Sequence, residues 1–109
     1  MSLIVLNCFV LGDDPDRAFT VKIPKKESVD ILKDRIKEKK ISHFNHSDAS
    51  DLGLWQVSFP IKYLKMELEN IDLARYQKLS PSNKKLATFF TNVVDDCLHV
   101  IVKAPGTYL

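Results

Sequence analysis

The distribution of apolar and polar residues near the N-terminus predicts two β-strands. Leu3 to Leu11 is apolar on both faces except at Asn7, which suits a strand in the middle of a sheet. Ala18 to Ile23 alternates cleanly, as a strand with one buried face does. Residues 12–17 between them are rich in Gly, Asp and Pro, which favour turns, so the two strands are predicted to form a hairpin.

The pattern then changes to the spacing of a helix, predicted over Ser28 to Lys40. Val29, Leu32 and Ile36 recur on one helical face. Ser28 is a favourable N-cap, because its hydroxyl can accept a hydrogen bond from a main-chain N–H of the first turn. The helix therefore has one apolar face with which to cover the hairpin.

The middle of the chain is less regular. Leu52 to Phe59 is typical of a third strand whose phase shifts partway, which a β-bulge or burial on both faces would explain. Residues 61–79 show no clear period, although apolar side chains are available to hold this segment against the core. They are Leu64, Leu68, Ile71, Leu73 and Tyr76. Ser80-Pro81, a capping residue followed by proline, predicts the start of a short second helix.

Cys97 to Lys103 is predicted to be the last strand. Its alternation assigns one set of residues to the core: Leu98, Val100 and Val102. It assigns the other set to the outward face: His99, Ile101 and Lys103.

The order strand, hairpin, strand, helix and further strands is that of a ubiquitin-like β-grasp, an α+β fold with a mixed sheet. We therefore expect a single domain over residues 1–109. One main helix should pack across the sheet, with a short second helix elsewhere. The last strand should lie beside the first in the centre of the sheet.

The amino-acid composition excludes fewer classes of function than the pattern of apolar and polar residues does. The net charge of +2 is too small to indicate nucleic-acid binding by itself. No stretch approaches the roughly 20 apolar residues needed to cross a bilayer, so no membrane span is expected. No Lys or Arg precedes the apolar stretch that starts at Leu3, and turn residues follow it, which argues against a cleaved signal peptide.

Catalytic and metal-binding chemistry is weakly indicated. Cys97 and His99 share one face of a strand, but nothing indicates the cleft and oxyanion site that a nucleophilic cysteine needs. His43 and His46, with nearby carboxylates, supply only part of a metal ligand set. We therefore expect no enzyme activity, no metal and no cofactor.

Cys8 and Cys97 are expected to be free thiols. A disulfide between them is the alternative, because pairing of the first and last strands could bring the two cysteines close together.

Lysines on and before the predicted helix provide an alternative hypothesis. They are Lys25, Lys26, Lys33, Lys37, Lys39 and Lys40. A basic face can bind nucleic acid, as in a module of the nucleus. Asp30, Asp34 and Glu38 interleave with these lysines, so a solvated face of mixed charge is the favoured interpretation.

Several segments, taken together and in order, resemble a known family. The segments are Leu6 to Pro15, Phe19 to Ile23, Ser28 to Lys39, Leu52 to Pro60, Leu79-Ser80-Pro81 and Leu98 to Val102. In this order they resemble the N-terminal domain of fungal Crinkler effectors, over nearly the whole chain.

The resemblance implies a ubiquitin-like domain at the head of a secreted effector, exported by a route without an evident signal peptide. Such effectors are translocated into a host cell and often reach its nucleus. The domain is implied to act without catalysis, in targeting and protein interaction. A variable effector domain follows it in the family, and we expect none within this chain. The oomycete branch carries Leu-Phe-Leu-Ala-Lys where this chain has Leu54-Trp55-Gln56-Val57-Ser58, so an uptake mechanism specific to that motif is not implied.

The predicted last strand is also similar to that of ubiquitin, Leu-His-Leu-Val-Leu-Arg. Its recognition-patch positions match His99 and Ile101 here. With Lys103 and Trp55 they are the predicted protein-interaction residues, although Trp55 also suits the core. The expected partner is a protein, a second copy of the chain included. Ala104 to Leu109 lacks the Gly-Gly end of ubiquitin, so conjugation to other proteins is not expected.

Overall fold

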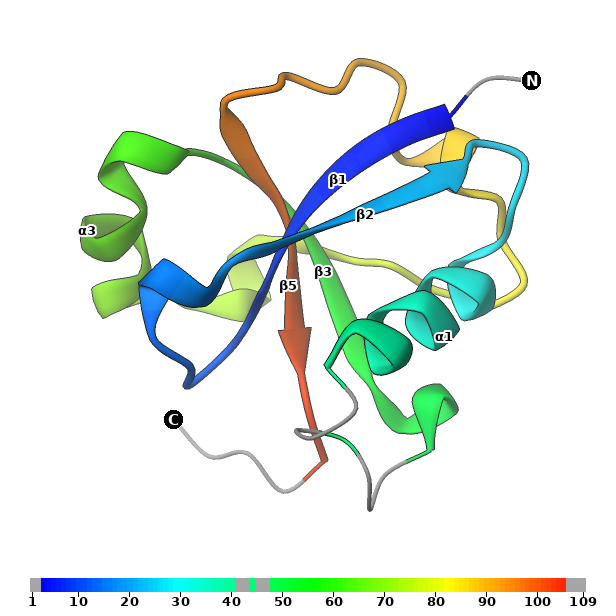
Figure 1. Ribbon diagram of the computed structural model, residues 1–109, viewed down its shortest axis with the longest axis horizontal. Coiled ribbons are helices and arrows are strands. Elements are labelled where there is room, and N and C mark those ends of the chain that lie inside the picture. Colours follow the sequence, from blue (N-terminus) through cyan, green and yellow to red (C-terminus); the bar gives the residue numbers. More distant parts are fainter. Residues whose placement is uncertain (1–2, 41–43, 45–47, 106–109) are drawn as a thin grey trace.

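Within the part of the chain that the structure describes, five strands form one mixed sheet in the order β2-β1-β5-β3-β4 (Figure 1). The computed structural model describes residues 3–40, 44 and 48–105. The strands are β1 (Leu3–Val10), β2 (Phe19–Pro24), β3 (Gly53–Pro60), β4 (Gln77–Lys78) and β5 (Cys97–Lys103). β1 and β5 are parallel neighbours in the centre, and the other neighbouring strands are antiparallel. This α+β arrangement confirms the predicted ubiquitin-like β-grasp.

β1 and β2 form the predicted hairpin, and its loop is held by local hydrogen bonds. The chain turns at Gly12, whose φ of 95° lies in the left-handed region that favours glycine. A 3-10 turn follows at Pro15–Arg17, where the Asp14 carboxylate accepts a hydrogen bond from the Asp16 N–H at 2.9 Å. The loop therefore presents a defined surface at one end of the sheet.

α1 (Val29–Lys39) starts where the sequence predicts, but another part of the chain caps its N-terminus. The first two N–H groups of the helix donate to the main-chain carbonyls of Lys84 and Ser82, at 3.0 and 2.9 Å. The Ser28 hydroxyl bonds instead to the Asp30 carboxylate and makes no capping bond to the helix. Since any oxygen acceptor can satisfy the free N–H groups of a first turn, this loop replaces the serine as the cap.

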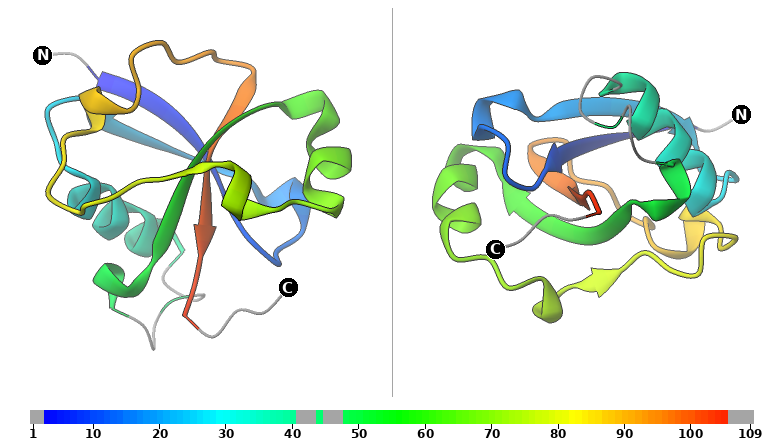
Figure 2. Two further views of the ribbon diagram at one scale, coloured as in Figure 1. Left: turned by 180° about the vertical axis from the view of Figure 1, so that it is seen from behind. Right: turned by 90° about the horizontal axis from the view of Figure 1, so that it is seen from below.

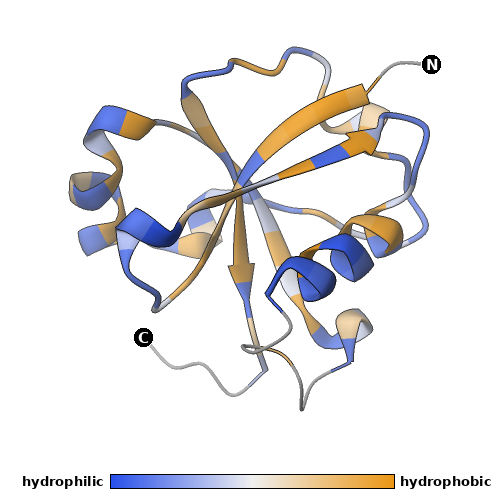
Figure 3. Cartoon of the chain, viewed as in Figure 1, coloured by the Kyte–Doolittle hydropathy of each residue, from blue (hydrophilic) through white to orange (hydrophobic). Residues whose placement is uncertain are grey.

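The larger part of the core lies between α1 and one face of the sheet. The helix contributes Val29, Leu32 and Ile36, all fully buried as predicted. The central strands contribute alternate residues, among them Leu6 and Val100. Figure 3 shows apolar residues concentrated along β1 and β5, in the middle of the molecule. Full burial of a side chain of this size stabilises the fold by about 1.5–3 kcal/mol, so this layer holds the helix to the sheet.

A second apolar layer covers the opposite face of the sheet. Residues 61–76 run across that face and include α3 (Leu64–Glu69), so that α1 and α3 lie on opposite sides of the sheet (Figure 2). Its buried members are Phe9, Leu11, Val57, Phe59, Leu64, Leu98 and Ile101. Leu68, Ile71, Leu73 and Tyr76 pack against them, which confirms that the apolar residues of this irregular segment hold it to the core.

A short helix besides α1 is present among the described residues, but it does not lie where the sequence predicts it. It is α3, whereas the chain after Ser80-Pro81 forms only a loop and one 3-10 turn at Leu86–Thr88. There the Leu86 N–H donates to the Glu27 carbonyl at 2.8 Å, so main-chain groups that a helix would need are used elsewhere.

None of the helices in the described part of the chain has the length and apolar character that crossing a membrane requires.

We predict that the α3 layer contributes strongly to stability. Leu64 is 5% exposed, whereas Met66 on the same helix is 65% exposed. Leu64→Ala should lower the free energy of unfolding by about 2–3 kcal/mol because it leaves a cavity under α3. Met66→Ala, the matched control, should change it by less than about 0.5 kcal/mol. Urea denaturation of both variants measures the difference, and equal small effects would mean that α3 is not packed on the sheet.

Candidate interaction site

The structure does not place the predicted recognition residues of β5 on an open surface. His99 is 5% exposed and Ile101 is fully buried. Ile101 belongs to the second apolar layer, together with Phe9 and Leu64. The prediction that these two side chains face solvent is therefore wrong, because residues 61–76 cover the face that the comparison with ubiquitin left open.

His99 instead holds two segments of the chain together. Its Nδ1 accepts a hydrogen bond from the Asn7 N–H at 2.9 Å, and its Nε2 lies 2.6 Å from the Val94 carbonyl. Because Nδ1 faces a donor and Nε2 faces an acceptor, these partners assign the ring proton to Nε2. Both ring nitrogens are therefore occupied by main-chain partners, and neither is available to a ligand.

Asn7, the hydrogen-bond partner of His99, is the single polar residue in the otherwise apolar first strand. Its Nδ2 donates to the carbonyls of Cys97 and Asp95, at 2.8 and 3.1 Å. Its Oδ1 accepts from the Thr20 hydroxyl at 3.1 Å. The β1–β5 ladder begins only at the next residue, Cys8. Asn7 and His99 thus join β1 to the start of β5 where main-chain pairing is missing.

The assignment of Leu98 to the same face as Val100 is also wrong. Leu98 lies in the second apolar layer with Ile101, whereas Val100 lies in the layer under α1. The pairing of β3 with β5 shifts between Gln56 and Phe59. A shift of one residue reverses the faces beyond it, which accounts for Leu98 and confirms the irregularity predicted for the third strand.

Trp55 and Lys103, the other predicted interaction residues, are half-buried on β3 and β5. The Trp55 ring lies over Gly53, where a Cβ atom on the glycine would come within 2.7 Å of the ring. The amine of Lys78 lies 5.3 Å from the centre of the Trp55 ring. Lys103 pairs with Gly53 across the sheet. Trp55 is the partner of Ile101 across the sheet. An interaction role for Trp55 and Lys103 stays a prediction.

The lysines of α1 do not form the single solvated face that the sequence predicts. Lys33 is only 7% exposed, and its amine donates to the Ser82 hydroxyl at 3.2 Å. Burial, with the nearby charge of Lys78, lowers the pKa of Lys33. Lys40 is half-buried and donates to the Arg17 carbonyl at 3.3 Å. Both amines bind the chain itself, which weakens the nucleic-acid alternative.

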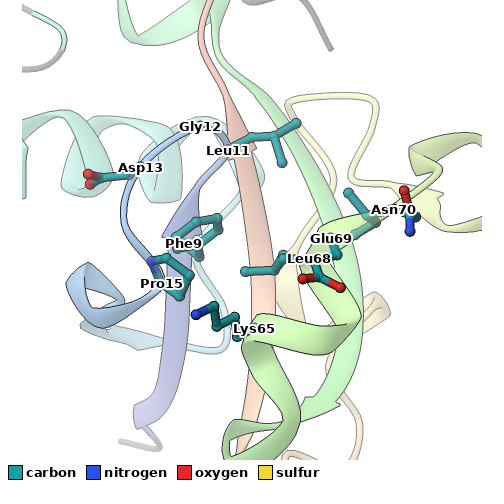
Figure 4. Close-up of a pocket in the computed structure, with 10 residues that line it drawn as sticks. Phe9, Leu11, Gly12, Asp13, Pro15, Lys65, Leu68, Glu69 and Asn70 are labelled. Carbon is teal, nitrogen blue, oxygen red and sulfur yellow. The ribbon is translucent and has the colours of Figure 1, made fainter.

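An open cleft does lie between the hairpin loop and the α3 segment, at residues that the sequence did not single out (Figure 4). Its volume is about 660 Å³. The lining residues are Phe9, Leu11, Gly12, Asp13, Pro15, Lys65, Leu68, Glu69, Asn70 and Ile71. A second hollow of about 780 Å³ continues it and shares Pro15 and Lys65. The signal that could have found the cleft is the row of apolar residues in 61–79 opposite a turn-rich loop.

The floor of the cleft is apolar and its rim is charged. Phe9 and Leu11 are 2% and 6% exposed, so they form a fixed floor, and Leu68 is half-buried beside them. In Figure 4 the Lys65 side chain reaches toward Phe9 and Pro15. An apolar floor with a few charged groups at the margin suits an apolar side chain of a partner.

The titratable groups in the lining of the cleft are carboxylates and one amine. The lining includes no Ser, Cys, His or Tyr. Cys8 is buried elsewhere, and burial raises the pKa of its thiol, which makes it unreactive. Cys8 and Cys97 are free thiols.

Metal binding has little support in the structure. No group of three or more His, Cys, Asp or Glu gathers to hold a metal ion within the part of the chain that is described. His43 and His46 lie outside the described residues.

Comparisons with known proteins agree on one family. Residues 4–103 match the Crinkler effector protein N-terminal domain. A curated relative from Rhizophagus irregularis, named Crinkler effector protein 1, is 32% identical over 102 residues. The match covers 94% of this chain but 22% of the relative. The chain therefore spans about a fifth of the length of that relative.

We predict that His99 is needed for stability. His99→Phe leaves the Asn7 N–H and the Val94 carbonyl without their partner, and a buried unsatisfied group typically costs about 1–3 kcal/mol. The free energy of unfolding should fall by about 2–3 kcal/mol. Lys103→Met, on the same strand, should change it by less than about 0.5 kcal/mol. A stable His99→Phe variant in thermal or urea denaturation would show that the two bonds contribute little.

We also predict that Lys33 destabilises the fold at neutral pH. Its pKa is lower in the folded than in the unfolded chain, so the unfolded chain binds this proton more readily. The unfolding free energy of the wild type should therefore rise toward pH of about 10.5, and Lys33→Met should lack this rise. The stability of Lys33→Met relative to the wild type should be greatest at pH 7 and should decrease as the pH rises toward about 10.5. A difference between Lys33→Met and the wild type that stays constant with pH would contradict this.

Proposed function

Since the chain belongs to the Crinkler effector N-terminal domain family, we propose that it is a non-catalytic header domain that targets an effector and binds protein. The relative is named as an effector, and the matched region is about a fifth of it. A domain of this kind accompanies a longer protein, and we propose the same role here. The protein is then secreted, enters a host cell and reaches the host nucleus.

The observation that carries the interaction role is the apolar floor of the hairpin–α3 cleft. Phe9 and Leu11 are held in the core and open onto the cleft, so their position does not depend on a partner. A partner side chain that fills such a preformed hollow gains the free energy of apolar burial without ordering the site first. Anchors of this kind carry most of the binding energy in protein interfaces.

The non-catalytic role is supported by what lines the cleft. The titratable residues among those that line it are Asp13, Lys65 and Glu69. The Asp13 carboxylate lies 4.0 Å from the Lys40 amine, on the side of the loop away from the cleft (Figure 4). No hydroxyl, thiol or imidazole side chain lines the cleft beside these groups, which supports binding rather than chemistry.

Delivery of a reporter tests the proposed function. The domain, fused in front of a reporter enzyme, is expressed in the organism that encodes it, and reporter activity is measured inside host cells. The fusion should reach host cells, whereas the reporter alone should not. Equal arrival of the reporter with and without the domain would contradict the targeting role.

Two variants test the cleft. Leu68→Asp with Ile71→Asp places charge in the cleft and should lower delivery by about tenfold, since a buried unpaired charge opposes binding. Val94→Asp, at a residue 51% exposed and outside the cleft, is the control and should deliver like the wild type. Circular dichroism checks that both variants fold. Normal delivery by the folded cleft variant would remove the cleft from the proposal.

A further inference from the structure

β2 is an outer strand of the sheet, with β1 on one side and, among the described residues, no strand on the other (Figure 1). In an antiparallel strand the N–H and C=O of one residue point to the same side, so alternate residues of β2 turn theirs away from β1. The Lys22 carbonyl accepts a hydrogen bond from Arg35 on α1, which places Lys22 and Thr20 in the outward set. Outside the β1–β2 ladder, no main-chain hydrogen bond between described residues reaches either of them. Groups of this kind are a template for another strand.

α1 borders this open edge with a row of side chains. Ile31, Arg35 and Lys39 follow one another at intervals of four residues and so share one flank of the helix. Arg35 shows which flank it is, because its guanidinium reaches the Lys22 carbonyl at 3.4 Å. Ile31 is half-buried against the core, whereas Arg35 and Lys39 are exposed. The edge therefore has main-chain groups on one side and an apolar residue with two cations on the other.

We propose that the β2 edge and this row of α1 bind an extended, acidic segment of a partner protein, which adds to the sheet as a further strand. Strand addition explains the affinity for an extended backbone, and the cations select for carboxylates. The proposal deepens the proposed protein-interaction function and rests on it, but it does not depend on the hairpin–α3 cleft.

Arg35 gives the edge its selectivity. In the free domain its guanidinium occupies the Lys22 carbonyl, in the way that charged side chains protect open strands from unwanted pairing. An arriving strand places its own N–H at that carbonyl and displaces Arg35. A carboxylate on the strand then offers the displaced guanidinium a charge-assisted hydrogen bond, which is stronger than the one it lost. A neutral or basic strand offers no such exchange.

A second copy of the chain is a poor occupant of this edge. If β2 paired with β2 of a second copy about a two-fold axis, the same surface of each copy would face that of the other. Lys22 and Arg35 would then face other cations across a short distance, which destabilises the pair. An acidic segment meets the same edge with opposite charge.

A peptide titration followed by amide NMR tests the proposal. The 109-residue chain, labelled with ¹⁵N, is titrated with an eight-residue peptide of alternating valine and glutamate. The amide signals of Thr20 and Lys22 should shift most, and a peptide of alternating valine and lysine should bind at least about tenfold more weakly. Equal binding of the two peptides, no shift with the acidic one, or shifts confined to other strands would overturn the proposal.

Charge reversal on α1 gives the matched comparison. Arg35→Glu should weaken binding of the acidic peptide by at least about tenfold. Lys37→Glu makes the same change of charge on the same helix away from this row, and should change binding by less than about threefold. Similar losses of peptide binding in both variants would indicate that the peptide is attracted only by the net charge of the domain, and would overturn the proposed site. The double cleft variant, Leu68→Asp with Ile71→Asp, should bind the peptide normally, so failure of the cleft and failure of the edge are told apart.

Discussion

Pairing of β1 with β5 is the contact on which the rest of this domain depends. It joins the first and last described strands, and each of its faces is covered by another segment. α1 packs on one face, and residues 61–76 pack on the other. Where the ladder stops, Asn7 and His99 continue the connection through side-chain hydrogen bonds. A sheet whose centre is covered from both sides leaves its margins for binding, namely the hairpin–α3 cleft and the β2 edge.

Much of the fold could be predicted because it follows from local periods. The two-residue alternation of the hairpin and the helical spacing of Val29, Leu32 and Ile36 each report one buried face. Their order then leaves few topologies for a mixed sheet. The short helix was misplaced because Ser80-Pro81 has a good local start signal, whereas its neighbours form tertiary hydrogen bonds to α1 and to Glu27. At this segment, hydrogen bonds to residues distant in sequence outweigh the local preference for a helix.

The candidate site was harder to predict, for a physical reason. Alternation tells which residues of β5 share a face, but it does not tell what covers that face. Ile101 was assigned correctly to the face opposite α1, yet a segment with no clear period covers that face. His99 looked like a surface residue because polar side chains usually are exposed, but Asn7 and Val94 satisfy it in the interior. The cleft depends on two segments far apart in the sequence, which no local pattern brings together.

Burial of Ile101 beneath residues 61–76 distinguishes this domain from a sheet with one open face, and solvent relaxation of methyl groups measures it. A soluble gadolinium chelate broadens the signals of methyl groups that it can approach. We expect the Ile101 methyl signals to stay as sharp as those of fully buried Leu6, while those of Val5, which is 42% exposed, broaden strongly. Broadening of Ile101 to the extent of Val5 would contradict this burial, because β5 would then present an open face as ubiquitin does.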